Sequence, residues 1–236
     1  MLEGLKRLFT RGGAAPAMDW DGVQPWAQAK QYEFRGVQSE GFVVDGRLGA
    51  TPWRLEWGPS QRSYIAGREL RLRCELGLGS DLHVLVMNRA LQEHMEAAVF
   101  NQYVEGVQTR IDDQTPPEMR WLVMFPKLSG AEMGDLRERY MAVASKKSWM
   151  LRWLQGPLAL ALASHRVNAA TPLVLMIGRG RLMLRTEMAE ADVTEIERWL
   201  RLFEVAIRET RRVAHESGDA LMPSQEPGQR SETDGV

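Results

Sequence analysis

The spacing of hydrophobic residues changes along the chain, and this change predicts where strands give way to helices. In residues 69–76, apolar side chains alternate with charged ones, so that one face of an extended segment is apolar and the other charged. A period of two with one charged face is typical of an antiparallel sheet that has one side in water. Residues 53–57 alternate in the same way and predict a neighbouring strand.

Other apolar runs predict further strands at 41–44, 82–87, 119–125, 173–177 and 181–186. The dipeptide Asp45-Gly46 suits a type I′ turn and predicts a hairpin after the first of these runs. Gly178-Arg179-Gly180 predicts a second hairpin between the last two. The run at 82–87 fits either a buried strand or the start of a helix.

Apolar residues at three- and four-residue intervals predict helices at 89–103, 129–145, 148–165 and 192–215. Ser129 and Glu132 have the spacing of a capping box, which favours a helix start. We expect the third helix to break at Gly156-Pro157, because proline cannot donate a hydrogen bond to the preceding turn. A short helix or strap is predicted at 19–32.

The order of these elements predicts an α+β fold: a mixed, mainly antiparallel β-sheet covered on one face by amphipathic helices. Each half of the chain ends with a strand region and a helix, which suggests two similar sheet–helix halves. We divide the chain into a flexible amphipathic segment at 1–16, a single globular domain at 17–216 and a disordered tail at 217–236. The tail is almost without apolar residues, so burial cannot offset the entropy lost on ordering.

Composition and charge narrow the classes of function. Hydrophobic residues make up 44% and charged residues 26% of the chain, as in an ordinary globular protein. The formal net charge of −1 argues against general nucleic-acid binding. A lone cysteine, Cys74, fits a reducing compartment, and no run reaches the ~18 apolar residues of a membrane span. We therefore expect a cytoplasmic protein without a transmembrane segment.

No motif for catalysis, metal binding or cofactor binding is found. The four histidines form neither HExxH nor HxH, and a single cysteine excludes the common thiolate zinc sites. The GxG fragments at 77–79 and 178–180 do not extend to a nucleotide-binding loop. We expect no catalytic residue, no metal and no cofactor.

Arginine provides the first candidate binding site. Only five of the 30 basic residues are lysines, so 25 are arginines, a bias that the codon usage of a GC-rich bacterial genome would also produce. Arginine binds carboxylates and phosphates through a planar fork of donors. Five arginines lie on or near the charged face of the predicted sheet: Arg54, Arg62, Arg68, Arg71 and Arg73. They could hold an anionic ligand, or they could form cross-strand ion pairs with glutamates on a wet surface.

Two further groups are candidates. Asp112, Asp113 and Glu118 fall in or beside a predicted loop, where paired carboxylates could do acid–base chemistry, bind a divalent ion or remain solvated. Leu5, Leu8 and Phe9 lie at helical spacing among basic residues in 1–11. Such a segment could contact a membrane surface or a partner groove, or could be a frayed terminus.

These observations leave three functional hypotheses. The first is a non-enzymatic interaction protein, an adaptor or accessory subunit, that binds a partner protein or a second copy of itself as a homodimer. It rests on the missing catalytic motifs and on the eight tryptophans and many arginines, because Trp and Arg dominate interface hot spots. The alternatives are a protein or enzyme that binds a small anionic ligand on the arginine face, and a peripheral membrane protein attached through residues 1–11.

Overall fold

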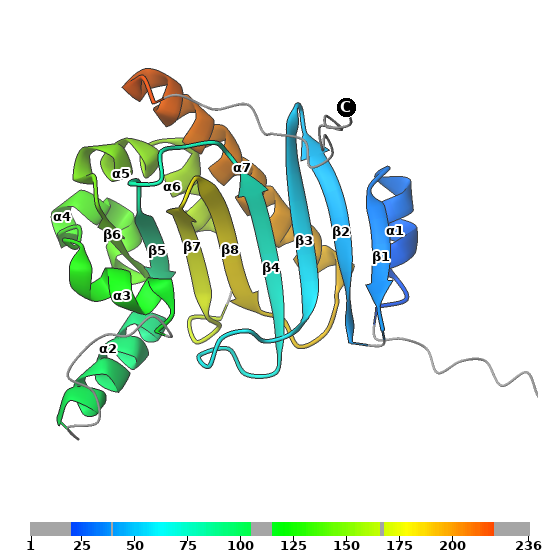
Figure 1. Cartoon of the computed structure of the whole chain (residues 1–236), viewed down its shortest axis with the longest axis horizontal. Coiled ribbons are helices and arrows are strands. Elements are labelled where there is room, and N and C mark those ends of the chain that lie inside the picture. Colours follow the sequence, from blue (N-terminus) through cyan, green and yellow to red (C-terminus); the bar gives the residue numbers. More distant parts are fainter. Residues whose placement is uncertain (1–19, 39, 105–114, 166–167, 220–236) are drawn as a thin grey trace, which may run out of the picture.

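The structure, a computed structural model, describes residues 20–38, 40–104, 115–165 and 168–219, and within them eight strands form one sheet (Figure 1). The strand order is β1-β2-β3-β4-β8-β7-β5-β6, and every ladder is antiparallel. The strands are β1 (Glu33–Val37), β2 (Gly41–Leu48), β3 (Thr51–Pro59), β4 (Arg68–Glu75), β5 (Val84–Asn88), β6 (Tyr140–Ala144), β7 (Leu173–Gly178) and β8 (Arg181–Glu187). The prediction of an α+β fold with a mainly antiparallel sheet is confirmed.

Helices pack against both faces of the sheet. They are α1 (Val23–Ala29), α2 (Arg89–Val104), α3 (Pro117–Met124), α4 (Gly130–Met133), α5 (Lys147–Trp153), α6 (Pro157–Ser164) and α7 (Val193–Ser217), with a 3₁₀ turn η1 (Gly134–Glu138). The predicted break between α5 and α6 at Gly156-Pro157 is confirmed. No helix in the described ranges has the length and apolar character needed to cross a bilayer.

The main core lies on one face of the sheet, under α1, α5, α6 and α7 (Figure 1). The alternation in β4 buries Leu70 and Leu72 completely or nearly so on this face, as its period of two requires. Helix α7 lies across the same face and buries Ile196 and Phe203. Each fully buried side chain of this kind stabilises the fold by ~1.5–3 kcal/mol.

The opposite face is covered by helices at one end. Over β5, β6 and β7 its side chains are apolar and pack under α2 and α3, where Leu91 and Trp121 are buried. Over β3 and β4 the same face carries charged side chains that are partly exposed, such as Arg54 and Arg73. The prediction that helices cover one face of the sheet therefore holds for the half that the first strands form, whereas at the other end helices cover both faces.

The predicted turn at Asp45-Gly46 is wrong, because β2 continues to Leu48 and the chain turns at Gly49, where φ is +60°. Gly46 is a strand residue that pairs with Trp53. A Cβ atom at Gly46 would lie 2.2 Å from the Trp53 ring, so the glycine makes room for an indole. Strand β1, at the edge of the sheet, was not among the predicted strands.

The predicted strand at 119–125 is also wrong, because these residues belong mostly to helix α3. Pro117 occupies the first turn of α3, where the missing amide hydrogen costs nothing. Trp121 and Leu122 face the sheet, whereas Val123 and Met124 are 56% and 66% exposed. The segment has a helical stripe that is too short to recognise from spacing alone.

The helix predicted at 129–145 ends early. Its capping box is confirmed: Ser129 Oγ accepts from the amide of Glu132, and the Glu132 carboxylate accepts from the amide of Ser129. Gly134 then takes a positive φ of +53°, a short 3₁₀ turn follows, and the chain enters β6.

Several regional predictions lie beyond what the structure tests. Residues 1–16 lie outside the described residues, as do residues 220–236 of the predicted tail. The similarity of two sheet–helix halves stays a prediction.

Candidate functional site

Three of the five predicted arginines form ion pairs on the charged face of the sheet. Arg54 binds Asp45 on the neighbouring strand through two contacts of 2.6 and 3.0 Å, and this hydrogen bonding raises the pKa of Arg54. Arg71 and Arg73 each lie 3.2 Å from the Glu56 carboxylate. These guanidinium groups link neighbouring strands of the sheet. Arg71 also borders a hollow of about 410 Å³ along β2 and β3.

Arg68 takes a different role. Its guanidinium lies 4.3 Å from the centroid of the Trp57 ring and donates a 2.6 Å hydrogen bond to the carbonyl oxygen of Glu40. Stacking of this kind covers a core tryptophan with a charged group. Arg68 therefore covers part of the core at Trp57.

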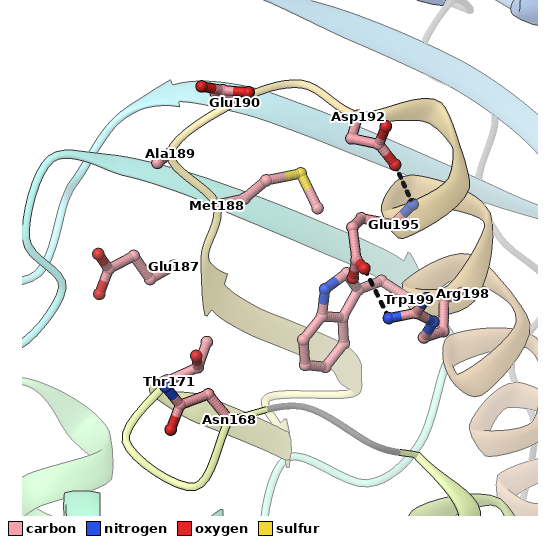
Figure 2. A pocket seen from close by; sticks show the side chains of 10 residues that line it. All are labelled: Asn168, Thr171, Glu187, Met188, Ala189, Glu190, Asp192, Glu195, Arg198 and Trp199. Atoms are coloured by element: carbon pink, nitrogen blue, oxygen red, sulfur yellow. Dashed lines mark hydrogen bonds and ion pairs between the residues drawn. The ribbon is translucent and has the colours of Figure 1, made fainter.

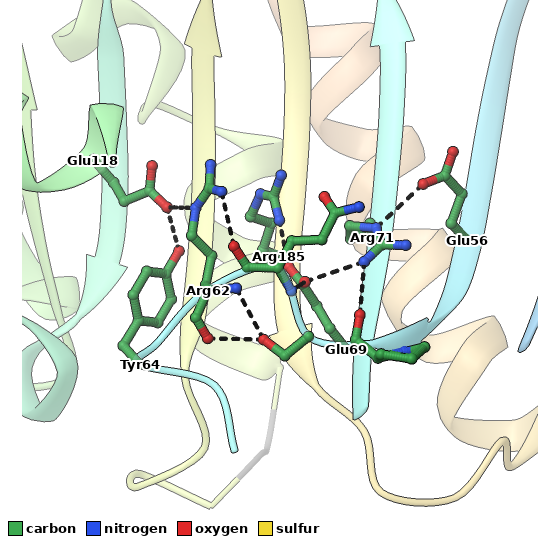
Figure 3. Close-up of polar contacts among 10 residues, drawn as sticks. Glu56, Arg62, Tyr64, Glu69, Arg71, Glu118 and Arg185 are labelled. Carbon is green, nitrogen blue, oxygen red and sulfur yellow. Dashed lines mark hydrogen bonds and ion pairs between the residues drawn. The ribbon is translucent and has the colours of Figure 1, made fainter. Parts of the chain in front are cut away.

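Arg62 is held by a buried carboxylate. Glu118, in the first turn of α3, is fully buried, and its Oε1 accepts hydrogen bonds from Arg62 Nε and the Tyr64 hydroxyl (Figure 3). Burial and the adjacent Glu118 charge raise the pKa of Tyr64 well above its usual value. Glu118 therefore lies in a helix rather than in a predicted acidic loop, and Asp112 and Asp113 lie outside the described residues.

A second buried carboxylate, Glu69, ties the loop after β3 to the sheet (Figure 3). It accepts from Arg185 Nη1 at 2.6 Å, from Arg71 Nη1 at 3.3 Å and from the amide of Gln61 at 2.9 Å. This carboxylate therefore fixes the backbone one residue before Arg62.

A cavity of about 790 Å³ opens beside Arg62, between α3 and the hairpin that joins β7 to β8. Four arginines line it, namely Arg62, Arg120, Arg179 and Arg181, together with His83. Within the described ranges, no carboxylate is among its lining residues. We call it the arginine cavity.

Two of these arginines pair with carboxylates that do not line the cavity. Glu118 holds Arg62, and Glu75 lies 2.5 Å from Arg181 Nε. Arg179 is exposed at the hairpin turn, where its φ is +53°, and it makes no hydrogen bond or ion pair with the described residues. The cavity thus combines fixed guanidinium groups with a more freely placed one.

The remaining wall of the cavity is apolar and aromatic. The His83 ring lies 5.4 Å from Phe125 and 4.8 Å from Trp121, measured between ring centroids. His83 Nδ1 lies 3.0 Å from the Asp81 carbonyl oxygen, which can only accept, so Nδ1 donates and Nε2 is free to accept in the neutral ring. A Cβ at Gly178 would lie 2.4 Å from the Trp121 ring, so this glycine lets the indole pack against the hairpin.

A second cavity, of about 480 Å³, lies beside the start of α7 and has the opposite charge (Figure 2). Its carboxylates are Glu187, Glu190, Asp192 and Glu195. Asp192 caps α7 by accepting from the amide of Glu195, and the Glu195 carboxylate binds Arg198 at 2.6 Å. Two of its four acids therefore have structural roles.

Other candidate chemistry is buried. All eight tryptophans are buried, so they present no exposed aromatic patch to a partner. Cys74 is buried in β4, and burial raises its thiol pKa to about 12, which disfavours the nucleophilic thiolate.

Sequence reasoning identified only one residue of the arginine cavity, Arg62. It assigned Arg120 to a strand and Arg179 to a turn. The one local signal was the pair of arginines that flank Gly180 at a predicted hairpin, because a hairpin end projects both side chains beyond the sheet.

Comparison with known proteins does not assign a family. No protein-family model matches the sequence, and no curated protein matches it. Among solved structures, the crystal structure of the mycobacterial trehalose monomycolate transport factor A, TtfA, is similar with a TM-score of 0.45 and 8% sequence identity, over 85% of this chain and 96% of that chain. A likeness this distant carries no functional argument.

Proposed function

We propose that this protein binds an anionic ligand in the arginine cavity. The observation that carries the proposal is the charge of the lining: four arginines and a histidine surround about 790 Å³, and their described neighbours in the lining include no carboxylate. A concave site lined by one sign of charge concentrates the opposite charge. Guanidinium groups match the oxygens of phosphate, sulfate and carboxylate groups.

The positions of the carboxylates support a preorganised site. Glu118 occupies Nε of Arg62 and the Gln61 carbonyl occupies Nη1, which leaves Nη2 for a ligand within the described part of the protein. Glu75 binds Arg181 through Nε and likewise leaves its terminal nitrogens. Side chains that are fixed before binding lose less entropy when the ligand arrives.

Titration of the protein with inorganic phosphate and sulfate, followed by isothermal calorimetry, tests the proposal. We expect saturable binding that weakens with added salt, because exposed charges are screened. Arg179→Gln and Arg181→Gln should each weaken binding by about tenfold or more, since a hydrogen bond to a charged group contributes ~1.5–3 kcal/mol. Arg208→Gln, on the exposed surface of α7, is the matched control. Equal affinity in all three variants would rule out this site.

An adaptor function is the second candidate, and the observation that favours it is the apolar surface of α3. Val123 and Met124 are exposed at adjacent positions, and Met124 also lines the arginine cavity. A partner that covers this surface should be lost from pull-downs with Val123→Asp or Met124→Asp. Light scattering of the purified protein would detect a homodimer, and an unchanged monomer with unchanged pull-downs would contradict this candidate.

Peripheral membrane attachment through residues 1–11 and a cytoplasmic location stay predictions. Liposome co-sedimentation with and without residues 1–11 tests the first of them. Equal sedimentation of both forms would exclude Leu5, Leu8 and Phe9 as an anchor.

A further inference from the structure

We infer that the ligand of the arginine cavity is amphiphilic, with an anionic head and an apolar chain or ring. This inference rests on the proposed function and deepens it. The cavity volume of about 790 Å³ falls in the range of roughly 300–1,000 Å³ that holds molecules much larger than a bare inorganic anion. Charge alone therefore does not account for the cavity.

The lining of the cavity is divided between charge and apolar surface. Arginines come from the loop after β3, from α3 and from the β7–β8 hairpin, whereas Trp121, Met124, Phe125, Met176 and Met183 supply apolar atoms. A site for a small inorganic anion needs donors on all sides, because a desolvated charge requires hydrogen bonds. An apolar wall of this kind suits a ligand that is charged at one end only.

Strand β8 shows how the sequence builds this division. On the charged face of the sheet, β8 presents Arg181, Met183 and Arg185 in succession, so that a methionine separates two arginines. Met183 pairs with Met176 on β7, and both methionines line the cavity. Methionine is flexible and polarisable, and it adapts to apolar groups of different shape.

The cavity rim also carries an apolar side chain in water. Met124 is 66% exposed, and it lies on the same helix as the buried Trp121. If the apolar part of a ligand entered between α3 and the hairpin, it would cover Met124 and Met183. The anionic head of the same ligand would remain near the arginines. A purely ionic ligand would leave Met124 and Met183 uncovered.

A series of ligands that share one head group tests the inference: inorganic phosphate, methyl phosphate, butyl phosphate and octyl phosphate, each below its aggregation concentration. We expect affinity to rise from methyl to octyl phosphate by at least roughly tenfold, because each fully buried methylene strengthens binding by about three- to fourfold. Octyl glucoside, which has the chain without the charge, should bind at least about tenfold more weakly than octyl phosphate.

Variants separate the two walls. Met183→Gln and Met124→Gln should flatten the dependence of affinity on chain length, measured as the ratio of octyl to methyl phosphate affinity, since glutamine keeps the side-chain length but replaces the apolar thioether with an amide. Leu160→Gln is the matched control, because Leu160 is 71% exposed on α6 and does not line the cavity. Circular dichroism of each variant verifies that it is folded.

The outcomes distinguish this inference from the proposed function. Equal affinity for inorganic and octyl phosphate would overturn the amphiphilic ligand and leave anion binding intact. Binding of neither would overturn both. A chain-length dependence that is unchanged in both methionine variants would show that the apolar group lies elsewhere and would also overturn the inference. Phosphatidic acid vesicles, compared with monomeric octyl phosphate, identify whether the amphiphile comes from a membrane or from solution; methionine-dependent binding to either supports the inference.

Discussion

At the scale of single residues, two buried glutamates position the arginine cavity. Glu69 and Glu118 are both fully buried, and each is neutralised by arginine. Between them they fix Gln61 and Arg62, the two residues that the loop after β3 contributes to the cavity. Desolvated charges are stable only when paired and hydrogen-bonded, so these contacts determine the local structure.

We predict that Glu118→Ala lowers the free energy of unfolding by about 3–5 kcal/mol, because it leaves the Arg62 charge without its buried partner. Tyr64→Phe removes one hydrogen bond to the same carboxylate and should cost about 1 kcal/mol. Urea denaturation measures both changes. Glu138→Ala, which breaks an exposed ion pair with Arg137, should cost less than about 1 kcal/mol. Similar losses for Glu118→Ala and Glu138→Ala would contradict the buried ion pair.

His165 should make stability depend on pH. Burial, reinforced by the charges of Arg198, Arg139 and Arg201, lowers its pKa from 6.5 to about 4. Its ring lies 4.2 Å from that of Trp199, and its Nε2 has no hydrogen-bond partner among the described residues. Between pH 6.5 and 4, His165 is therefore protonated in the unfolded chain but stays neutral in the folded protein. The free energy of unfolding falls as the pH drops through this range.

The variant His165→Phe keeps an aromatic ring against Trp199 and should flatten this pH dependence. Denaturant midpoints at pH 7, 6, 5 and 4 would show the difference between the variant and the wild type. His94→Phe, at an exposed position of α2, should retain the wild-type dependence. If the denaturant midpoint of His165→Phe depended on pH as steeply as that of the wild type, this histidine would be excluded as the source of the pH dependence.

At the scale of elements, spacing predicted strands well where one face was wet, whereas among the strands buried on both faces it predicted β7 and missed β6. Strand β4 was predicted because its charged and apolar residues alternate. Strand β6 is buried on both faces, since helices cover both sides of the sheet at that end, so its sequence shows no period of two. Helix α3 has only two turns, and its apolar stripe is too short to distinguish it from a buried strand.

The arginine cavity could not be predicted because it forms between elements that are distant in the sequence. Arg62 follows β3, Arg120 lies on α3, and Arg181 begins β8. They meet because β8 inserts beside β4, and β7 then places the hairpin under α3. Sequence reasoning marked Arg62 alone as a candidate and placed Arg179 and Arg181 only in a predicted hairpin, and no local pattern joins them.

Gly178 should be required for the contact between the hairpin and α3. We predict that Gly178→Ala lowers the free energy of unfolding by about 1–3 kcal/mol, because its Cβ would overlap the Trp121 ring and the packed wall can yield only with strain. Denaturation followed by tryptophan fluorescence measures this. Gly36→Ala, in β1, has open space around its new Cβ and should change stability by less than about 1 kcal/mol. Equal effects would show that the Trp121 contact is unimportant.

At the scale of the whole molecule, the sheet joins the two ends of the sequence. Strand β4, from the first third of the chain, pairs along its length with β8, from the last third. Helix α7 packs on the same core as β3 and β4, and Glu197 of α7 accepts a hydrogen bond from the indole of Trp26. The main core therefore runs across both halves of the sheet.

We therefore predict that the protein unfolds in one cooperative transition. Circular dichroism, which follows α7 and the other helices, and tryptophan fluorescence, which follows both ends of the sheet, should give the same midpoint. Leu72→Ala, at the seam between β4 and β8, should lower both midpoints together, with a loss of about 2–5 kcal/mol. A variant at the seam can destabilise both regions equally only if they fold as one unit. Two separate transitions, or a midpoint shift in only one of the two signals, would therefore show that the chain holds two independently stable units.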